Sequence, residues 1–135
     1  MTGLEKRRQA ERRGRQAETL VAMRLRLKGW RKLAARYRNS FGEIDLIMSK
    51  PQRLLFVEVK YTTSISDDAL EAVLPSPRQQ KRIINAAKGF LAEYPDHQND
   101  EMQVVVALVR PYGRIRFIND HFFDMFDAKN VGLDC

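Results

Sequence analysis

The chain has 135 residues, of which 44% are hydrophobic and 30% charged, and its formal net charge is +7 at pH 7. This length suits one domain, and the composition is that of a globular protein, which argues against wholesale disorder. Its one cysteine, Cys135, excludes an internal disulfide and a cysteine-based zinc site. No apolar run reaches the roughly 18 residues of a transmembrane helix, and the start lacks the apolar core of a signal peptide. We therefore expect a cytoplasmic protein.

The positive charge is concentrated at the start of the chain. Residues 1–38 hold 13 Lys or Arg against 3 Asp or Glu, a net of +10, whereas residues 39–135 hold 11 against 14, a net of −3. Such a segment indicates a polyanionic partner, nucleic acid first and an anionic membrane surface second. The segment lacks a clean apolar face of aromatic and leucine side chains, which disfavours the membrane. A solvated basic tail is the remaining alternative.

The first predicted element is a helix from about residue 4 to residue 28. Its apolar side chains follow helical spacing, and Gly29 is a suitable end. Gly14 either breaks this segment or starts its packed part. Residues 31–38 then alternate between apolar and basic side chains, which predicts an edge strand.

Two further strands, residues 41–48 and 54–60, carry acids inside otherwise apolar sequence. Burying a carboxylate is unfavourable unless another group compensates for it, so these acids indicate a site. Side chains alternate between the two faces of a strand. One face of the first strand should therefore carry Glu43, Asp45 and Ile47, and the other Ile44, Leu46 and Met48.

On the second of these strands, Phe56, Glu58 and Lys60 should share a face. If residues 49–52 turn the chain back, the two strands pair and Asp45 converges with Glu58 and Lys60. Two carboxylates and an ammonium group at one point suit the binding of a divalent metal and the activation of water.

The second half of the chain predicts one long helix and two strands. Ser76, Pro77 and Gln79 have the order of a capped helix start, and Pro95 is a suitable stop. The β-branched run 104–109 predicts an interior strand, 114–118 a last strand, and the residues from Asn119 a short closing helix. The order of helix, three strands, helix and two strands predicts a mixed α/β fold.

The motifs around the acids resemble the YraN-type family of small bacterial proteins. The likeness is carried by Gly14-Arg-Gln-Ala-Glu18, Phe41-Gly-Glu-Ile-Asp-Leu-Ile47 and Leu55-Phe-Val-Glu-Val-Lys60, and it continues in Glu71-Ala-Val73 and Arg82-Ile-Ile-Asn-Ala-Ala87. This resemblance implies a restriction-endonuclease-like fold, similar to archaeal Holliday-junction resolvases, with a mixed sheet of about five strands flanked by helices. It divides the chain into a basic N-terminal extension, residues 1–13, and one nuclease-like domain, residues 14–130.

The same resemblance implies a site. Asp45 and Glu58 are similar to the metal-binding carboxylates of these nucleases, Lys60 to the catalytic lysine, and Glu18 to an acid contributed by the first helix. The implied cofactor is Mg²⁺ or Mn²⁺, and the implied activity is a structure-selective DNA endonuclease that hydrolyses phosphodiester bonds, with branched DNA as one candidate substrate. Because junction resolvases act as dimers, a homodimer is also an expected assembly.

Two alternatives stay open. Judged from the strand pattern alone, Asp45 and Glu58 are acids on a solvated sheet face, paired with Lys60, because a bare Glu-x-Lys is common. The chain also departs from its relatives at Gln103, where aspartate is frequent, and at Gln79, where a basic residue is frequent. Gln79 removes a possible phosphate contact, whereas Gln103, which cannot supply a full negative charge, supports a second function, a non-catalytic nucleic-acid-binding accessory in DNA repair, recombination or competence.

Overall fold

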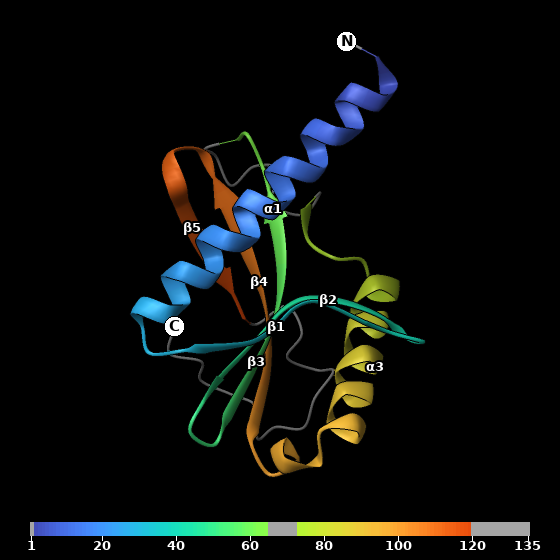
Figure 1. Ribbon diagram of the computed structural model, residues 1–135, viewed down its shortest axis with the longest axis vertical. Coiled ribbons are helices and arrows are strands. Elements are labelled where there is room, and N and C mark those ends of the chain that lie inside the picture. The colour runs from blue at the N-terminus through green and yellow to red at the C-terminus, as the bar shows by residue number, and fades with distance from the viewer. Residues whose placement is uncertain (1, 65–72, 120–135) are drawn as a thin grey trace.

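Five strands form one mixed sheet with a helix on each face in the computed structural model of the protein (Figure 1). The structure describes residues 2–64 and 73–119. Its helices and strands are α1 (Gly3–Leu27), β1 (Arg31–Asn39), β2 (Gly42–Lys50), β3 (Arg53–Tyr61), α3 (Pro77–Glu93), β4 (Glu101–Arg110) and β5 (Arg114–Ile118). Two short 3₁₀ helices, η2 (Pro95–His97) and η3 (Pro111–Gly113), precede the last two strands. The α/β fold with a five-stranded mixed sheet is confirmed.

The strands lie in the order of the chain, β1-β2-β3-β4-β5. Neighbouring strands are antiparallel except for β3 and β4, which are parallel. Parallel neighbours need a long connection, and α3 lies in the connection between them. The two acid-bearing strands are therefore adjacent, as the sequence predicts, and β3 is paired on both sides.

Each face of the sheet has its own hydrophobic core. On one face α1 buries Ala17, Val21 and Leu25 against alternate residues of the interior strands, among them Leu46, Met48, Leu55, Val57, Val105 and Ala107. On the other face α3 buries Ile83, Ala87 and Phe90 against Ile44, Ile47, Phe56, Val104 and Val106. Because β3 and β4 are covered on both faces, their apolar runs are nearly continuous.

Hydrogen-bonding side chains define where both long helices begin. Ser76 and Gln79 form the predicted capping box at the start of α3, with Pro77 in the first position. Thr2 and Glu5 form a second capping box at the start of α1. Gly14 does not break this helix. All side chains from Thr2 to Arg13 are exposed, and packing against the sheet begins after them.

The predicted alternation of faces along β2 is wrong at one point. Ile44 lies in the core beneath α3, whereas Leu46 and Met48 lie in the core beneath α1. The reversal falls at Asp45, opposite Arg36 of β1, whose backbone has a positive φ of 53°. That left-handed conformation is unusual for a residue other than glycine, and it interrupts the regular pleat of the β1–β2 pair.

The predicted closing helix lies outside the described residues beyond Asn119, as do Glu71 and Ala72 of the family likeness. Among residues 2–64 and 73–119, no helix has both the length and the apolar character needed to cross a bilayer.

Candidate functional site

Asp45 lies where β2 separates from β3. The two strands pair from Lys50 and Arg53 up to Leu46 and Val57, and beyond that point β2 no longer pairs with β3. The backbone N–H of Val59 therefore has no strand partner on this side, and it donates a hydrogen bond of 2.7 Å to the Asp45 carboxylate. The side chain of Asp45 replaces a backbone acceptor at the opening of the sheet.

Glu58 completes a coupled acid pair with Asp45. Burial, followed by the neighbouring Asp45 charge, raises the pKa of Glu58 to about 7. Burial also raises the pKa of Asp45, although the hydrogen bond from Val59 opposes this shift. The two carboxyl groups share a hydrogen bond, which favours a proton on Glu58 and a charge on Asp45.

Lys60 lies beside this acid pair. Its Nζ is 3.4 Å from Oε1 of Glu58, and its charge lowers the pKa of both acids without cancelling the effect of burial. Glu58 and Lys60 line a cavity of about 320 Å³ that also contacts Gln79 and Arg82 of α3. The structure thus brings together three of the four residues predicted from the sequence.

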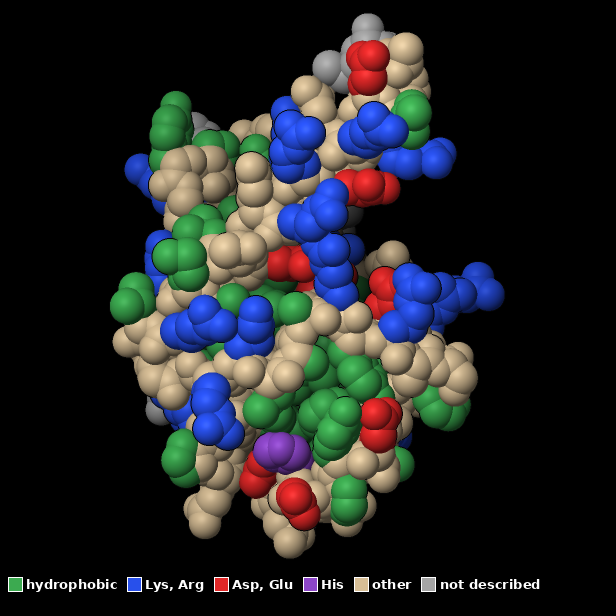
Figure 2. All heavy atoms as spheres, in the orientation of Figure 1, with side chains coloured by type: hydrophobic (Ala, Val, Ile, Leu, Met, Phe, Trp, Pro, Cys, Tyr) green, Lys and Arg blue, Asp and Glu red, His purple; other side chains and the backbone are tan. Residues whose placement is uncertain are grey.

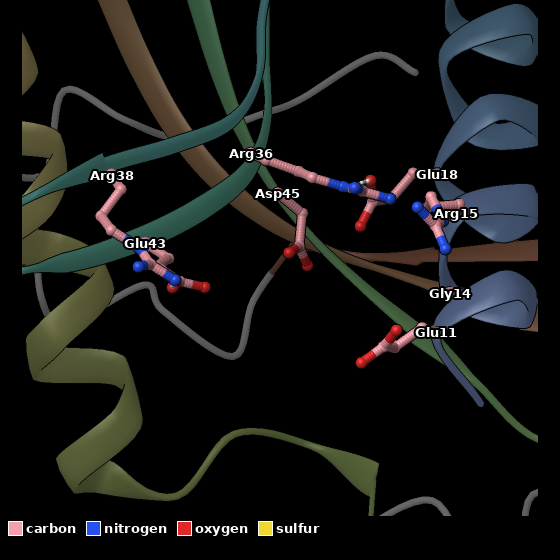
Figure 3. A pocket seen from close by; sticks show the side chains of 8 residues that line it. All are labelled: Glu11, Gly14, Arg15, Glu18, Arg36, Arg38, Glu43 and Asp45. Atoms are coloured by element: carbon pink, nitrogen blue, oxygen red, sulfur yellow. Dashed lines mark hydrogen bonds and ion pairs between the residues drawn. The ribbon is translucent and has the colours of Figure 1, made fainter. Parts of the chain in front are cut away.

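Glu18, the fourth, approaches from α1 but is bonded to another residue. Its Oε1 accepts a hydrogen bond of 3.0 Å from Nε of Arg36, an ion pair that spans the space between α1 and β1 (Figure 3). Glu18 and Asp45 line the same cavity of about 390 Å³, and the Glu18 charge contributes to the raised pKa of Asp45. Glu18 is a neighbour of the acid pair and a partner of Arg36.

Arg36 is a site residue that the sequence analysis missed. Its positive φ turns an edge-strand side chain toward α1, where it meets Glu18. Backbone strain of this kind costs on the order of 1–3 kcal/mol and often occurs at functional sites. No motif in the sequence indicates it, because arginine seldom adopts this conformation and the alternation around it appears regular.

Glu43 closes the other side of the cavity. Its carboxylate is bonded to Arg38, its neighbour across the β1–β2 pair, and it lines both cavities beside the acid pair. Figure 2 shows a hollow between the projecting part of α1 and the ends of β1 and β2, with acidic side chains at its base and Lys or Arg on both sides. The acidic side chains are thus flanked by Lys and Arg side chains.

The donor set of the acid pair suits a divalent cation. Two adjacent carboxylates provide hard oxygen donors, and Mg²⁺ needs only one or two because it keeps several waters. Burial, followed by the Asp45 charge, raises the pKa of Glu58, and the single charge of Lys60 does not offset these effects. Within residues 2–64 and 73–119, however, no three His, Cys, Asp or Glu side chains are grouped so as to hold a metal. Two carboxylates fit a cation, and Glu18 does not join them in this arrangement.

The two glutamine departures lie in different places. Gln103 is level with Leu55 in the parallel β3–β4 register, whereas Glu58 is level with Val106. Three residues of strand separate the two levels, roughly 10 Å. Gln103 is therefore remote from the acid pair. Gln79 lies at the cavity of Glu58 and Lys60, where its side chain accepts from the backbone N–H of Ser76.

The matches to known proteins include every residue of this site. The sequence model of a family described as "Uncharacterised protein family UPF0102" matches residues 17–117. A UPF0102 protein of Bradyrhizobium diazoefficiens is 43% identical over 120 residues, which are 89% of this chain and 85% of the relative. Another, from Bradyrhizobium sp. (strain ORS 278), is 45% identical over 89% of this chain and 80% of the relative. A third, from Rhodopseudomonas palustris (strain BisA53), is 40% identical over 89% and 87%.

Proposed function

This chain belongs to the UPF0102 (YraN-type) family, and we propose that it is a metal-dependent endonuclease that hydrolyses phosphodiester bonds in DNA. The observation that carries this proposal is the acid pair with Lys60 beside it. Asp45 and Glu58 share a hydrogen bond at the opening between β2 and β3, and Lys60 contacts Glu58. Buried, coupled titratable groups with raised pKa values in a cavity are typical of catalytic sites.

Asp45 and Glu58 would hold Mg²⁺ or Mn²⁺. The bound cation would make water more acidic and offset negative charge on the phosphate. The Val59 N–H holds the Asp45 carboxylate in place beside Glu58. Lys60 would orient the attacking water or neutralise a phosphate oxygen, since its ammonium group is a compact charge with three donors.

Charge balance favours catalysis over simple DNA binding at this point of the surface. Without a cation, the charge on Asp45 would repel a phosphate backbone, and so would Glu58 wherever it has lost its proton, whereas Glu18 and Glu43 are paired with Arg36 and Arg38. A binding module gains nothing from such acids at the base of a basic hollow. A cation held by the pair turns the same position into an attractive one.

A non-catalytic DNA-binding accessory is the second candidate. It is favoured by the Glu18–Arg36 ion pair, which keeps the helix acid bonded away from the acid pair. In that case the acids serve the fold, with Asp45 capping the Val59 N–H and Lys60 balancing Glu58.

Cleavage assays separate the two candidates. Purified protein is incubated with labelled duplex, flap, single-stranded and four-way-junction DNA in Mg²⁺, Mn²⁺ or EDTA. We expect cleavage only with a divalent cation, and a loss of roughly a hundredfold or more in Asp45→Asn and Lys60→Ala, as for other removals of a catalytic electrostatic group. Asparagine still accepts from Val59, so the fold is kept.

Matched controls are Asp96→Asn and Lys88→Ala, which change exposed residues outside the cavities of the acid pair and should cut at the parental rate. Cleavage in EDTA, or by Asp45→Asn at the parental rate, would contradict the metal mechanism. Binding to DNA without cleavage of any substrate would favour the accessory function.

A further inference from the structure

We propose that the groove between α1 and β1 holds the backbone of one DNA strand and leads it to the acid pair. The proposal rests on DNA as the substrate of the proposed function, and it assigns a surface that the catalytic residues do not include. Three observations support it: the groove's charges, the absence of a partner for three of its four cations among the described residues, and the groove's continuity with the cavity of Asp45.

Cations surround this groove, and its floor is apolar. The groove has a volume of about 330 Å³ and is lined by Arg15, Glu18, Thr19, Ala22, Met23, Arg26, Lys32, Ala35, Arg36 and Leu46. Four of these residues are Lys or Arg and one is acidic, which leaves a net charge of +3. Arginine and lysine contacts to phosphate supply most sequence-independent affinity for DNA, and a small apolar floor can contact the sugars.

Three of the four cations have no partner in the described part of the chain. The side chains of Arg15, Arg26 and Lys32 form no hydrogen bond or ion pair with residues 2–64 or 73–119. Neighbouring cations on α1 do have contacts, because Arg24 donates to the carbonyl oxygen of Gly113 and Lys28 lies over the ring of Phe117. The groove therefore gathers positive charge that the fold itself does not use.

The groove continues into the cavity that Asp45 lines. Arg15, Glu18 and Arg36 line both spaces, so the groove ends where Asp45 begins. In Figure 3 the Glu18–Arg36 ion pair lies between α1 and the Asp45 carboxylate. A strand that follows the groove would reach the cavity of Asp45 past the Glu18–Arg36 ion pair, which spans α1 and β1 where the two spaces meet.

The dimensions of the groove suit a short length of one strand. Arg15 and Arg26 are eleven residues apart on α1, about 16 Å along the helix axis. At a rise of about 3.4 Å per nucleotide, this distance corresponds to about five nucleotides. A lipid surface is less suitable, because the cations lie within a groove between two elements and Met23 is the one large apolar side chain on it that is well exposed among the described residues.

Equilibrium binding in EDTA tests the proposal without depending on cleavage. Arg26→Ala/Lys32→Ala removes two groove cations, and Lys88→Ala/Arg114→Ala removes the same charge from exposed positions elsewhere. Fluorescence anisotropy with labelled 12-nucleotide single-stranded and duplex DNA is measured from about 50 to 200 mM salt, the range over which phosphate contacts weaken strongly. We expect the groove variant to lose roughly tenfold or more in affinity, and its slope of log K against log salt to fall by roughly one to two, since each phosphate contact contributes about one.

The control variant should keep a slope near that of the parent. Equal losses in the two variants would overturn the proposal, because the effect would then follow net charge alone. It would also be overturned if the groove variant bound DNA normally and lost binding only to vesicles of anionic phospholipid. If the groove variant does not fold by circular dichroism, Arg26→Gln/Lys32→Gln keeps the side-chain stems and is judged by the same outcomes. If no DNA is cut but the groove variant still loses affinity selectively, the groove assignment stands and only the proposed hydrolysis fails.

Discussion

Among the site residues, Glu58 offers the most direct experimental test of the site's chemistry. Its side chain is 17% exposed, and it lies next to a second acid and within 3.4 Å of one ammonium group. One cation cannot balance two buried carboxylates, so the pair retains a proton near neutral pH. The same imbalance that raises the pKa of Glu58 is what a divalent cation would relieve.

This imbalance predicts how stability depends on pH. The pKa of Glu58 is raised from 4.5 to about 7 by folding, so between these values the folded protein binds a proton that the unfolded chain has lost. The free energy of unfolding should therefore fall as the pH rises from about 4.5 to 7. Glu58→Gln removes the titration, and its stability relative to the parent should increase over the same window.

Urea unfolding of both proteins at pH 5 and pH 8 measures this difference. In Glu101→Gln, an exposed control, the difference from the parent should not change with pH. A Glu58→Gln variant whose stability relative to the parent is the same at both pH values would show that Glu58 is not held protonated in the fold.

At the scale of elements, helix α1 has two different halves. From Ala17 onward it packs on the sheet and brings Glu18 to the site, whereas the side chains of Thr2–Arg13 are all exposed. The exposed half begins with a capping box at Thr2 and carries five Lys or Arg. It projects from the domain beside the hollow that contains the acids (Figures 1 and 2). The capping box defines where the helix begins, although within residues 2–64 and 73–119 this half buries no side chain in the core.

Deleting residues 2–13 should therefore weaken DNA binding much more than it lowers stability. The deletion removes five cations and no buried side chain, so the urea midpoint should change little and the salt dependence of DNA affinity should become flatter. Replacing the same five residues by glutamine keeps the helix length and separates charge from shape. Unchanged affinity and salt slope in both variants would identify this half as a solvated tail.

How far the sequence predicts this structure differs between elements. The start of α3 was predictable because Ser76, Pro77 and Gln79 act on their own local backbone. The pairing of the acid strands was predictable because the strands are close in sequence and joined by a short turn. The reversal of faces at Asp45 was not, because it coincides with a left-handed conformation at Arg36 on the neighbouring strand, which no local pattern predicts. Nor was the Glu18–Arg36 ion pair, which joins two elements whose relative position only the packed sheet defines.

On the scale of the whole molecule, charge is separated by sign. Residues 1–38 contribute +10, and they form α1 and β1, the two walls of the groove, whereas the acid pair lies on β2 and β3. The basic walls attract a phosphate backbone over several ångströms, and the acids repel it at short range. A substrate would therefore be drawn toward a point that it cannot approach closely until the carboxylates are neutralised.

This separation predicts a response of DNA binding to calcium, which takes carboxylate oxygens as ligands as Mg²⁺ does. Added salt of any kind weakens DNA binding by screening, so at constant ionic strength the effect of Ca²⁺ should come from the site alone. We expect Ca²⁺ to raise the DNA affinity of the parent by several-fold, because a cation on Asp45 and Glu58 removes their repulsion of phosphate.

In Asp45→Asn/Glu58→Gln the repulsion is already absent and the cation has no ligands, so affinity should be higher than the parent's in EDTA and should not respond to Ca²⁺. Fluorescence anisotropy measures the DNA affinity of the parent and of the double variant, each in EDTA and in Ca²⁺. The control is Asp96→Asn/Glu101→Gln, which changes two exposed acids outside the cavities of the acid pair and should behave as the parent does. A parent protein whose affinity falls in Ca²⁺ as much as that of the double variant would show that the acid pair does not hold a cation near DNA.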